Sequence, residues 1–326
     1  MLTLKRITLS SELVLGVIVD YGAGNFLKEA VSSLEACRVA KIIVVDNGFS
    51  EGVKPSSEDV LDLKDQKTGI PIEILTPESN RGLGAGVNLA VMSERSFGTL
   101  DQRYKYLLIC NPDVQASESS VNKLVEILES DKAVGVVGPV IREVDGQIYP
   151  SARSFPSVFD AAGHAIFGRI WENNPFTRRY HLITTEKINR KGTLTENSEE
   201  KPNHKAQLAY PDWVSGAFMI LRLDVFLEVG GFDERFFLYL EDVDLCYKLK
   251  ELGYKSCYVR GSEVVHAGGS TTKNVEIKSI IAHHVSAFRF EKKHSRGARR
   301  LLLGFSFLLL GARCLVLVTF SKIKSR

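Results

Sequence analysis

The chain has 326 residues, which is enough for one large domain with an appendage or for two smaller domains. Its 42 basic and 39 acidic side chains leave a formal charge of +3, so the composition gives no electrostatic case for a nucleic-acid partner. The five cysteines are scattered without a CxxC pair, which argues against a disulfide framework or a zinc site and indicates buried thiols.

The N-terminal half alternates between two kinds of hydrophobic pattern. Four apolar runs rich in branched residues predict strands covered on both faces: 13–19, 40–46, 70–75 and 105–110. Helical periodicity between them predicts helices over 26–37 and 84–96. This alternation predicts an α/β domain with a mainly parallel sheet, in which ligands bind beyond the carboxyl ends of the strands.

Polar turns follow three of these strands. They are Asp46-Asn47-Gly48, Asn80-Arg81-Gly82 and Asn111-Pro112-Asp113. Each alone is an ordinary turn composition. Their shared position at strand ends favours a binding site.

A glycine-rich loop, NRGLGAGVN (80–88), separates a strand from a helix. A dinucleotide-binding loop requires GxGxxG after the first strand, whereas Gly82, Gly84 and Gly86 follow the third strand with the spacing GxGxG. The loop therefore does not indicate a dehydrogenase. Its glycines would still let backbone N–H groups approach a phosphate at a helix start.

The segment 171–211 is polar and weakly periodic, and we expect it to be a long insertion. The hydrophobic pattern returns after this segment and predicts a short helix over about 242–252. Glu241, Asp242 and Asp244 stand at its start, where carboxylates cap free backbone N–H groups. Capping needs one or two acids, so the third carboxylate leaves a functional role open.

The C-terminal segment 301–320 is 20 residues long and apolar, and basic residues flank both of its ends. This length suits a helix that spans a bilayer, but Arg313 interrupts it at a cost of roughly 2.5–3.5 kcal/mol on insertion scales. We favour a helix lying in the membrane interface with its arginines extended toward headgroups. A membrane span and a buried core helix are the alternatives.

Six segments together resemble glycosyltransferase family 2, most closely its bacterial rhamnosyltransferase branch. They are VVDNG (44–48), NRGLGAGVN (80–88), LLICNPDV (107–114), DWVSGAFMILR (212–222), GGFDERFFLYLEDVDLCYKLKELGY (230–254) and VVHAGGST (264–271). The resemblance implies a GT-A (nucleotide-diphospho-sugar transferase) fold over 1–271, with a mainly parallel central sheet flanked by helices. Residues 272–326 would then form a helical, basic and apolar membrane-associating region.

The same resemblance implies a dTDP-sugar donor, dTDP-rhamnose, and a polyprenyl-diphosphate-linked sugar acceptor. The enzyme would add rhamnose with inversion in bacterial cell-surface polysaccharide synthesis. It would work at the cytoplasmic face of the inner membrane, either peripherally or anchored by its C-terminus.

The resemblance gives each donor-side motif a role. Asp46 matches the acid that accepts a hydrogen bond from the imide N–H of the pyrimidine, which either uracil or thymine provides. Arg81 and Asn88 resemble the residues beside the nucleotide diphosphate. Asn111 and Asp113 stand where many members carry Asp-x-Asp, so Asp113 is the one anionic ligand in that motif for Mg²⁺ or Mn²⁺.

His266 resembles a histidine that completes the metal site in some GT-A enzymes, although a lone histidine after a strand can equally be structural. Asp242 matches the family's catalytic base. Glu241 would orient that base or touch the acceptor or the metal, and Asp244 would stabilise the first turn of the helix. A departure lies at Asp20-Tyr21-Gly22, where the family has a Thr-Tyr-Asn-like turn, and it puts the donor in doubt more than the reaction.

Two alternatives stay open beside this hypothesis. The first is the same fold with a UDP-sugar donor. The second is a GT-A-like subunit that has lost catalysis, for which the incomplete Asp-x-Asp motif is the best support. A sugar nucleotidyltransferase is disfavoured because VIVDYGAGNF (17–26) carries no basic residue near the first strand.

Overall fold

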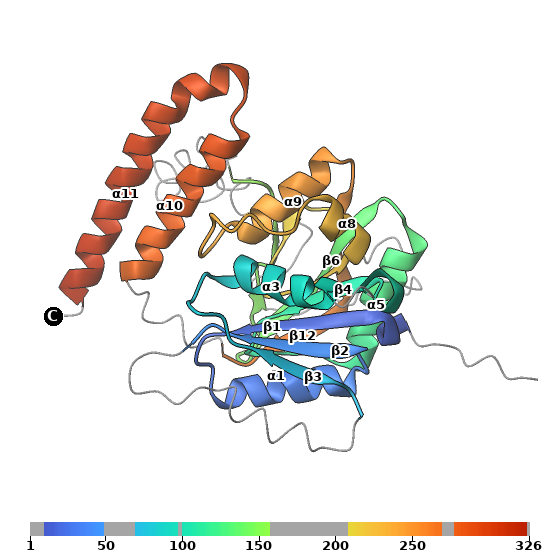
Figure 1. The fold of residues 1–326 in the computed structure, drawn as a ribbon. Coiled ribbons are helices and arrows are strands. Elements are labelled where there is room, and N and C mark those ends of the chain that lie inside the picture. The colour runs from blue at the N-terminus through green and yellow to red at the C-terminus, as the bar shows by residue number, and fades with distance from the viewer. Residues whose placement is uncertain (1–9, 49–68, 97–99, 157–207, 269–276, 325–326) are drawn as a thin grey trace, which may run out of the picture.

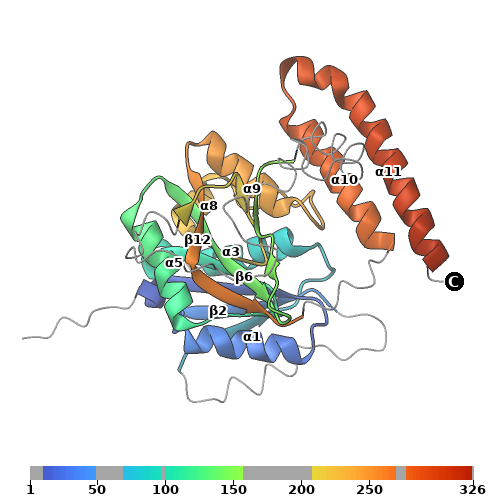
Figure 2. The same cartoon turned by 180° about the vertical axis from the view of Figure 1, so that it is seen from behind.

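A computed structural model of the chain describes residues 10–48, 69–96, 100–156, 208–268 and 277–324. It consists of an α/β body with a helical hairpin beside it, as Figures 1 and 2 show from opposite sides. Most of the predicted insertion 171–211 and the predicted domain boundary at 271/272 lie outside the described residues.

The body is built on one mixed sheet with the strand order β3-β2-β1-β4-β11-β6-β12-β5, to which β7 and β9 add at the side. Its strands are β1 (Val14–Asp20), β2 (Lys41–Asp46), β3 (Ile72–Leu75), β4 (Tyr106–Cys110), β5 (Val114–Gln115), β6 (Val134–Glu143), β7 (Ile148–Tyr149), β9 (Leu208–Ala209), β11 (Phe218–Arg222) and β12 (Lys255–His266). Strands β3, β2, β1 and β4 run parallel, whereas β11 is antiparallel to both of its neighbours. The four predicted strands are confirmed to within two residues at each end.

Alternating side chains give the sheet two apolar faces. Val14 and Ile18 of β1 belong to one buried cluster, whereas Leu15 and Val17 belong to the other. Helices α1 (Asn25–Ala36) and α5 (Glu118–Ser130) cover the first face. The second face is covered by α3 (Leu83–Ser96), α8 (Leu223–Glu228) and α9 (Glu241–Glu251). The remaining elements of the body are η1 (Ser10–Leu13), α4 (Leu100–Arg103) and the small sheet of β8 (Ala152–Arg153) with β10 (Trp213–Val214).

These elements confirm the α/β prediction, because helices flank a mostly parallel sheet on both sides. The five cysteines are free, and all except Cys314 are buried, as their scattered positions predicted.

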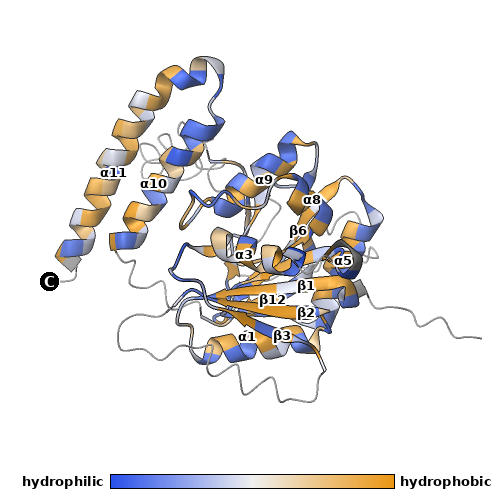
Figure 3. Ribbon diagram, viewed as in Figure 1, coloured by the Kyte–Doolittle hydropathy of each residue, from blue (hydrophilic) through white to orange (hydrophobic). Residues whose placement is uncertain are grey.

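The C-terminal hairpin consists of α10 (Ile277–His294), the 3-10 turn η4 (Gly297–Leu302) and α11 (Leu303–Lys324). Figure 3 shows that α11 is largely hydrophobic, and it is long and apolar enough to cross a membrane. Only 6% of its most apolar window is buried, so α11 is not a core helix of this chain. Its Arg313 lies 3.5 Å from the His284 Nε2 of α10, so the arginine has a partner within the hairpin.

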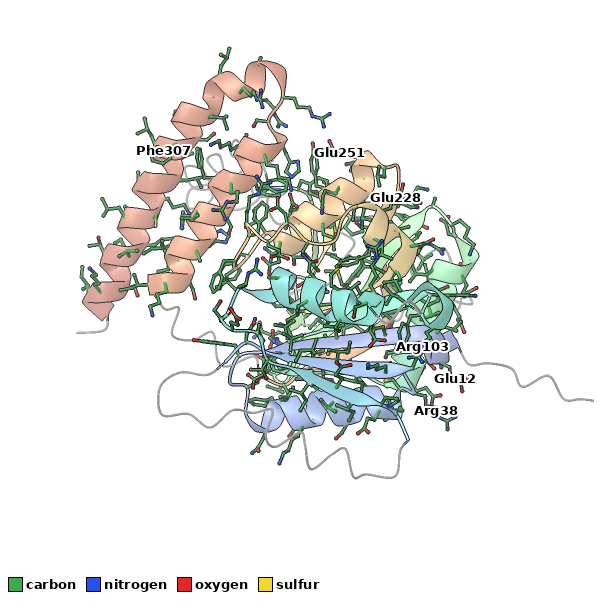
Figure 4. The ribbon with its side chains drawn as sticks, viewed as in Figure 1. Glu12, Arg38, Arg103, Glu228, Glu251 and Phe307 are labelled. Carbon is green, nitrogen blue, oxygen red and sulfur yellow. The ribbon has the colours of Figure 1, made fainter. Side chains whose placement is uncertain are left out.

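The two helices of the hairpin also meet through aromatic rings. Phe307 of α11, labelled in Figure 4, makes an edge-to-face contact with Phe288 of α10 at 5.3 Å between ring centroids. Elsewhere α11 exposes large apolar side chains on its surface: Phe305, Leu308, Leu315, Val316, Phe320 and Ile323. Exposed apolar surface on this scale indicates a surface that is covered in the working protein.

Candidate active site

Carboxylates gather at the carboxyl ends of β1 and β2. Asp20 and Asp46 are paired in register at the last position of these parallel strands, and both are buried. Asp20 accepts hydrogen bonds from the backbone N–H groups of Gly22 and Ala23, and Asp46 accepts one from Gly48. Asp46 therefore lies at the strand end that the sequence predicted, while its contact with a pyrimidine stays a prediction. Asp20 was not predicted as a site residue, although its position at a strand end gave the same signal.

The Asn111-Pro112-Asp113 turn follows β4 in the same edge of the sheet. The backbone N–H of Asn111 donates to the carbonyl of Ala217 at 2.8 Å, which joins the turn to the strand β11. Asp113 lies beside β12, because the neighbouring Val114 of β5 pairs with His266. The Nε2 atom of His266 is 3.1 Å from Oδ2 of Asp113. The fold thus brings the two predicted metal ligands together.

The two oxygens of the Asp113 carboxylate differ in their surroundings. Its Oδ1 atom is buried and finds no hydrogen-bond partner among the described residues. A side chain at Gly268 would overlap the Oδ2 side of the Asp113 carboxylate, so glycine is needed there for the chain after β12 to pack against Asp113. No group of three or more His, Cys, Asp or Glu side chains forms a metal cluster in the described part of the chain. A carboxylate and an imidazole nitrogen 3.1 Å apart fit a divalent cation that takes its other ligands from a diphosphate and water.

Glu143, at the end of β6, lies next to the other ring nitrogen of His266. Its Oε1 atom is 3.1 Å from Nδ1 of His266. Hydrogen bonding to Asp113, with a smaller effect of Glu143, raises the pKa of His266 to about 9. Carboxylates in this position fix the orientation of metal-ligating histidines. Sequence reasoning missed Glu143, because a single glutamate near the end of a strand carries no motif.

The glycine-rich loop packs against the turn that precedes α9. Gly82 has φ +88°, and a Cβ there would overlap the carbonyl oxygen of Phe237. A Cβ at Gly84 would lie 2.8 Å from the side chain of Phe232. The glycines are therefore required for close packing within the protein. The predicted use of the loop for phosphate binding is not needed to explain them.

Arg81 and Asn88 contact that same turn. Arg81 forms an ion pair with Glu234. The amide of Asn88 donates to the carbonyl of Phe232 at 2.9 Å and to Glu234 at 3.1 Å, and its oxygen accepts from the N–H of Phe232. Both side chains thus connect the glycine-rich loop and the start of α3 to residues 232–234. Their contact with a nucleotide diphosphate stays a prediction.

The chain enters α9 through strained backbone. Tyr239 and Leu240 have φ angles of 66° and 65°, which branched and bulky residues rarely adopt. Residues held in this region typically cost about 1–3 kcal/mol each, and they cluster at functional sites. The strain occurs immediately before Glu241 and Asp242.

Asp242 is held in place by backbone donors. Its Oδ2 accepts from the N–H of Gly216 at 2.9 Å, and its Oδ1 accepts from Val243 at 2.8 Å. Burial raises the pKa of Asp242 above the ordinary value. Taken as a whole residue, Asp242 is half-buried.

Glu241 is more deeply buried than its neighbour, and its Oε2 has no hydrogen-bond partner within the described ranges. Burial, together with the charge of Asp242, raises the pKa of Glu241 to about 8. At neutral pH Glu241 therefore holds its proton, and the pKa of Asp242 beside it is raised as well. Carboxyl groups whose pKa values are raised by burial and by a neighbouring carboxyl group are common at acid–base sites.

Asp244, which we expected only to stabilise the start of the helix, also forms ion pairs with another helix. It is fully buried, and its carboxylate lies 2.7 Å from the ammonium of Lys293 and 2.7 Å from Nε2 of His294. Both partners belong to α10. Asp244 therefore connects the hairpin to the helix that carries Asp242, a contact 49 residues away in sequence that no local pattern could predict.

Solved structures of other proteins share the fold of this chain. The mannosyltransferase PcManGT from Pyrobaculum calidifontis, solved in complex with GDP-Man and Mn²⁺, matches with a TM-score of 0.54 at 13% identity. The match covers 94% of this chain and 75% of that chain. The fold is therefore the GT-A fold of nucleotide-sugar transferases.

Two family models cover the sequence. Glycosyl transferase family 2 matches residues 17–202, and Glycosyl transferase family group 2 matches residues 160–322. The chain is 31% identical over 280 residues to the N-acetylglucosaminyl-diphospho-decaprenol L-rhamnosyltransferase of Mycobacterium tuberculosis, covering 84% of this chain and 82% of that protein. It is 24% identical over 281 residues to rhamnosyltransferase WbbL of Escherichia coli K12, covering 84% and 90%. The chain belongs to glycosyl transferase family 2 and is a glycosyltransferase.

Proposed function

We propose that this enzyme transfers L-rhamnose from dTDP-rhamnose, with inversion, to a polyprenyl-diphosphate-linked N-acetylglucosamine. The observation that carries the proposal is the 31% identity, over 84% of the chain, to a relative named for rhamnosyl transfer to N-acetylglucosaminyl-diphospho-decaprenol. Asp46 can accept a hydrogen bond from the thymine imide N–H of this donor. It does not distinguish thymine from uracil, because both bases carry that N–H.

Asp242 serves as the base in this proposal. Inversion is a single in-line displacement in which the acceptor hydroxyl loses a proton while the nucleoside diphosphate leaves from the opposite face. The Gly216 and Val243 N–H groups fix the Asp242 carboxylate, and its raised pKa makes it a better proton acceptor. Glu241 beside it, whose pKa burial raises to about 8, holds its proton at neutral pH and adds no second negative charge next to the proposed base.

Asp113 and His266 would hold a divalent cation, with Glu143 orienting the imidazole. When bound, the ion would supply Lewis-acid stabilisation of the departing diphosphate. The unpartnered Oδ1 of Asp113 favours this role over a catalytically inactive subunit. The loss of one carboxylate at Asn111 does not remove the site, since His266 provides a second ligand.

The hairpin suits a lipid-linked acceptor. We infer that α11 lies in the interface at the cytoplasmic face of a bacterial inner membrane, and the exposed apolar side chains of α11 support this placement. An enzyme held at that surface diffuses on the same membrane as its lipid-linked acceptor, so the two meet more often. Whether α11 lies along the interface or spans the bilayer is decided by protease protection of its C-terminus in sealed vesicles.

The test is transfer of radiolabel to N-acetylglucosaminyl-diphospho-polyprenol in vesicles, with dTDP-rhamnose and a panel of UDP-sugars as donors. Each donor is assayed with Mg²⁺, with Mn²⁺ and with a chelator, for the wild type and for Asp113→Asn. We expect metal-dependent transfer from dTDP-rhamnose that Asp113→Asn weakens. Transfer from a UDP-sugar alone would replace the donor, and no transfer from any donor would favour the inactive subunit.

A further inference from the structure

A basic cavity lies between the hairpin and the turn that precedes α9. It has a volume of about 440 Å³. Five cations from three separate elements line it: Arg235, Arg289, Lys292, Lys293 and Arg300. Val285 and Phe288 of α10 add an apolar wall. None of these residues belongs to the donor site described above.

The cavity carries an excess of positive charge. Asp233 pairs with both Arg235 and Lys293, and Asp244 pairs with Lys293. Within the described ranges, no carboxylate lies at ion-pairing distance from Arg289, Lys292 or Arg300. Three cations, of which Lys292 and Arg300 are exposed and Arg289 is half-buried, therefore give the cavity a positive potential that attracts an anion.

The position of the cavity indicates what kind of anion it takes. On one side, Lys293 contacts Asp244 and so joins the cavity to the helix that begins with the proposed base. On the other side, Arg300 is followed by Leu301 and Leu302, which are 85% and 39% exposed, and then by the apolar surface of α11. A ligand in this cavity would have its anionic group among the cations and an apolar tail on the hairpin.

We propose that this cavity binds the diphosphate of the lipid-linked acceptor, with the polyprenyl chain leaving along η4 and α11. This inference rests on the proposed function. Guanidinium groups pair with phosphate oxygens in bidentate fashion, and two arginines with one lysine are enough to neutralise a diphosphate esterified at both ends. Attraction to anionic phospholipids needs only cations on an open surface, whereas these converge on a concave site from η4, α10 and the 231–240 turn.

The double variant Arg289→Gln/Lys292→Gln tests the proposal, because it removes two cations from the cavity without touching the ion pairs of Lys293. Lys105→Gln/Lys123→Gln, which removes two charges from the body, is the matched control. Both variants are assayed with the diphosphate-linked acceptor in vesicles and with an alkyl N-acetylglucosaminide that lacks the diphosphate. Thermal unfolding verifies that each variant folds.

We expect the cavity variant to raise the KM for the diphosphate-linked acceptor by about 10-fold or more, since two charge-assisted contacts are lost. The donor KM and the turnover of the diphosphate-free acceptor should stay within about 2-fold of the wild type. An unchanged acceptor KM, or an equal loss with both acceptors, would overturn the proposal.

Vesicle flotation separates the two sources of phosphate and does not depend on turnover. The vesicles contain phosphatidylcholine alone, with phosphatidylglycerol, or with polyprenyl diphosphate. We expect the cavity variant to lose the extra binding to polyprenyl diphosphate vesicles while keeping its binding to phosphatidylglycerol vesicles. Equal loss on both would assign the cavity to general anionic lipid and overturn the proposal. If the wild type transfers no sugar, the proposed function fails, and flotation alone still decides the cavity.

Discussion

The ammonium of Lys293 in α10 lies 2.7 Å from the fully buried carboxylate of Asp244 in α9, two positions after the proposed base. This ion pair makes the hairpin part of the architecture around Asp242. The hairpin, with the exposed apolar surface of α11, is thereby joined to the helix that begins beside the proposed base.

We expect Lys293→Met to lower the free energy of unfolding by about 3 kcal/mol, because it removes the ammonium partner of the buried Asp244 carboxylate. Asp244→Asn/Lys293→Met should lose less than the sum of the single variants, since neither charge is then stranded. Urea unfolding of the three variants measures this coupling. Strict additivity would contradict a direct interaction.

The raised pKa of Asp242 predicts a pH profile. A base works only when ionised, so kcat/KM should rise about tenfold per pH unit below this pKa and level off above it. Because burial raises the pKa, the inflection should lie above the ordinary value of 3.8. Initial rates between about pH 4 and pH 8 locate it. An inflection at or below 3.8 would contradict the described environment.

Glu241 should make the fold less stable as the pH rises. Its pKa is about 8 in the folded chain against an ordinary 4.5, so between these values the folded state holds a proton that the unfolded state has lost. The free energy of unfolding then falls by about 1.4 kcal/mol per pH unit in this window. Glu241→Gln removes this dependence, and its advantage over the wild type in urea unfolding should grow from pH 5 to pH 8. A constant difference would show that Glu241 is already ionised.

Glu143→Gln tests the orientation of His266. Loss of a carboxylate partner of a metal-ligating histidine typically weakens metal affinity about 10–100-fold. We expect the Mn²⁺ concentration for half-maximal activity to rise by this factor, while the donor KM at saturating metal stays unchanged. Calorimetric titration with Mn²⁺ gives a second readout. Unchanged Mn²⁺ affinity would contradict the assignment.

Gly82→Ala should destabilise the fold more than Gly146→Ala. The two glycines have similar φ angles of +88° and +83°, but a Cβ at Gly82 would overlap Phe237 whereas a Cβ at Gly146 meets open space. The backbone strain of about 1 kcal/mol is common to both. Thermal unfolding should show a further loss of about 2 kcal/mol for Gly82→Ala, and equal losses would remove the packing explanation.

Sequence reasoning predicted the strands because a short run that is apolar on both faces, such as 40–46, indicates a buried strand. It also predicted that Asp46 and Asp113 would end strands, since parallel strands place their carboxyl ends at one edge. The contact between Asp113 and His266 followed from a resemblance, and the structure supplies the pairing of β5 with β12 that produces it.

The remaining features depend on contacts between distant residues. The carbonyl of Phe232 meets Asn88 across 144 positions, and no local pattern indicates it. The glycines of the loop suggested phosphate binding, whereas packing against Phe237 explains Gly82. Asp244 looked like a helix-start carboxylate, because its partner Lys293 lies in a helix whose relation to the body only the fold reveals.

The most direct test of the account is Asp242→Asn, measured beside Asp145→Asn, which changes an exposed carboxylate in the turn after β6. The amide keeps the shape of the side chain but cannot take the acceptor's proton. The account predicts that kcat for sugar transfer falls by about 10²–10⁴-fold in Asp242→Asn, with an unchanged donor KM and an unaffected control. Transfer by Asp242→Asn at a rate close to that of the wild type would contradict it.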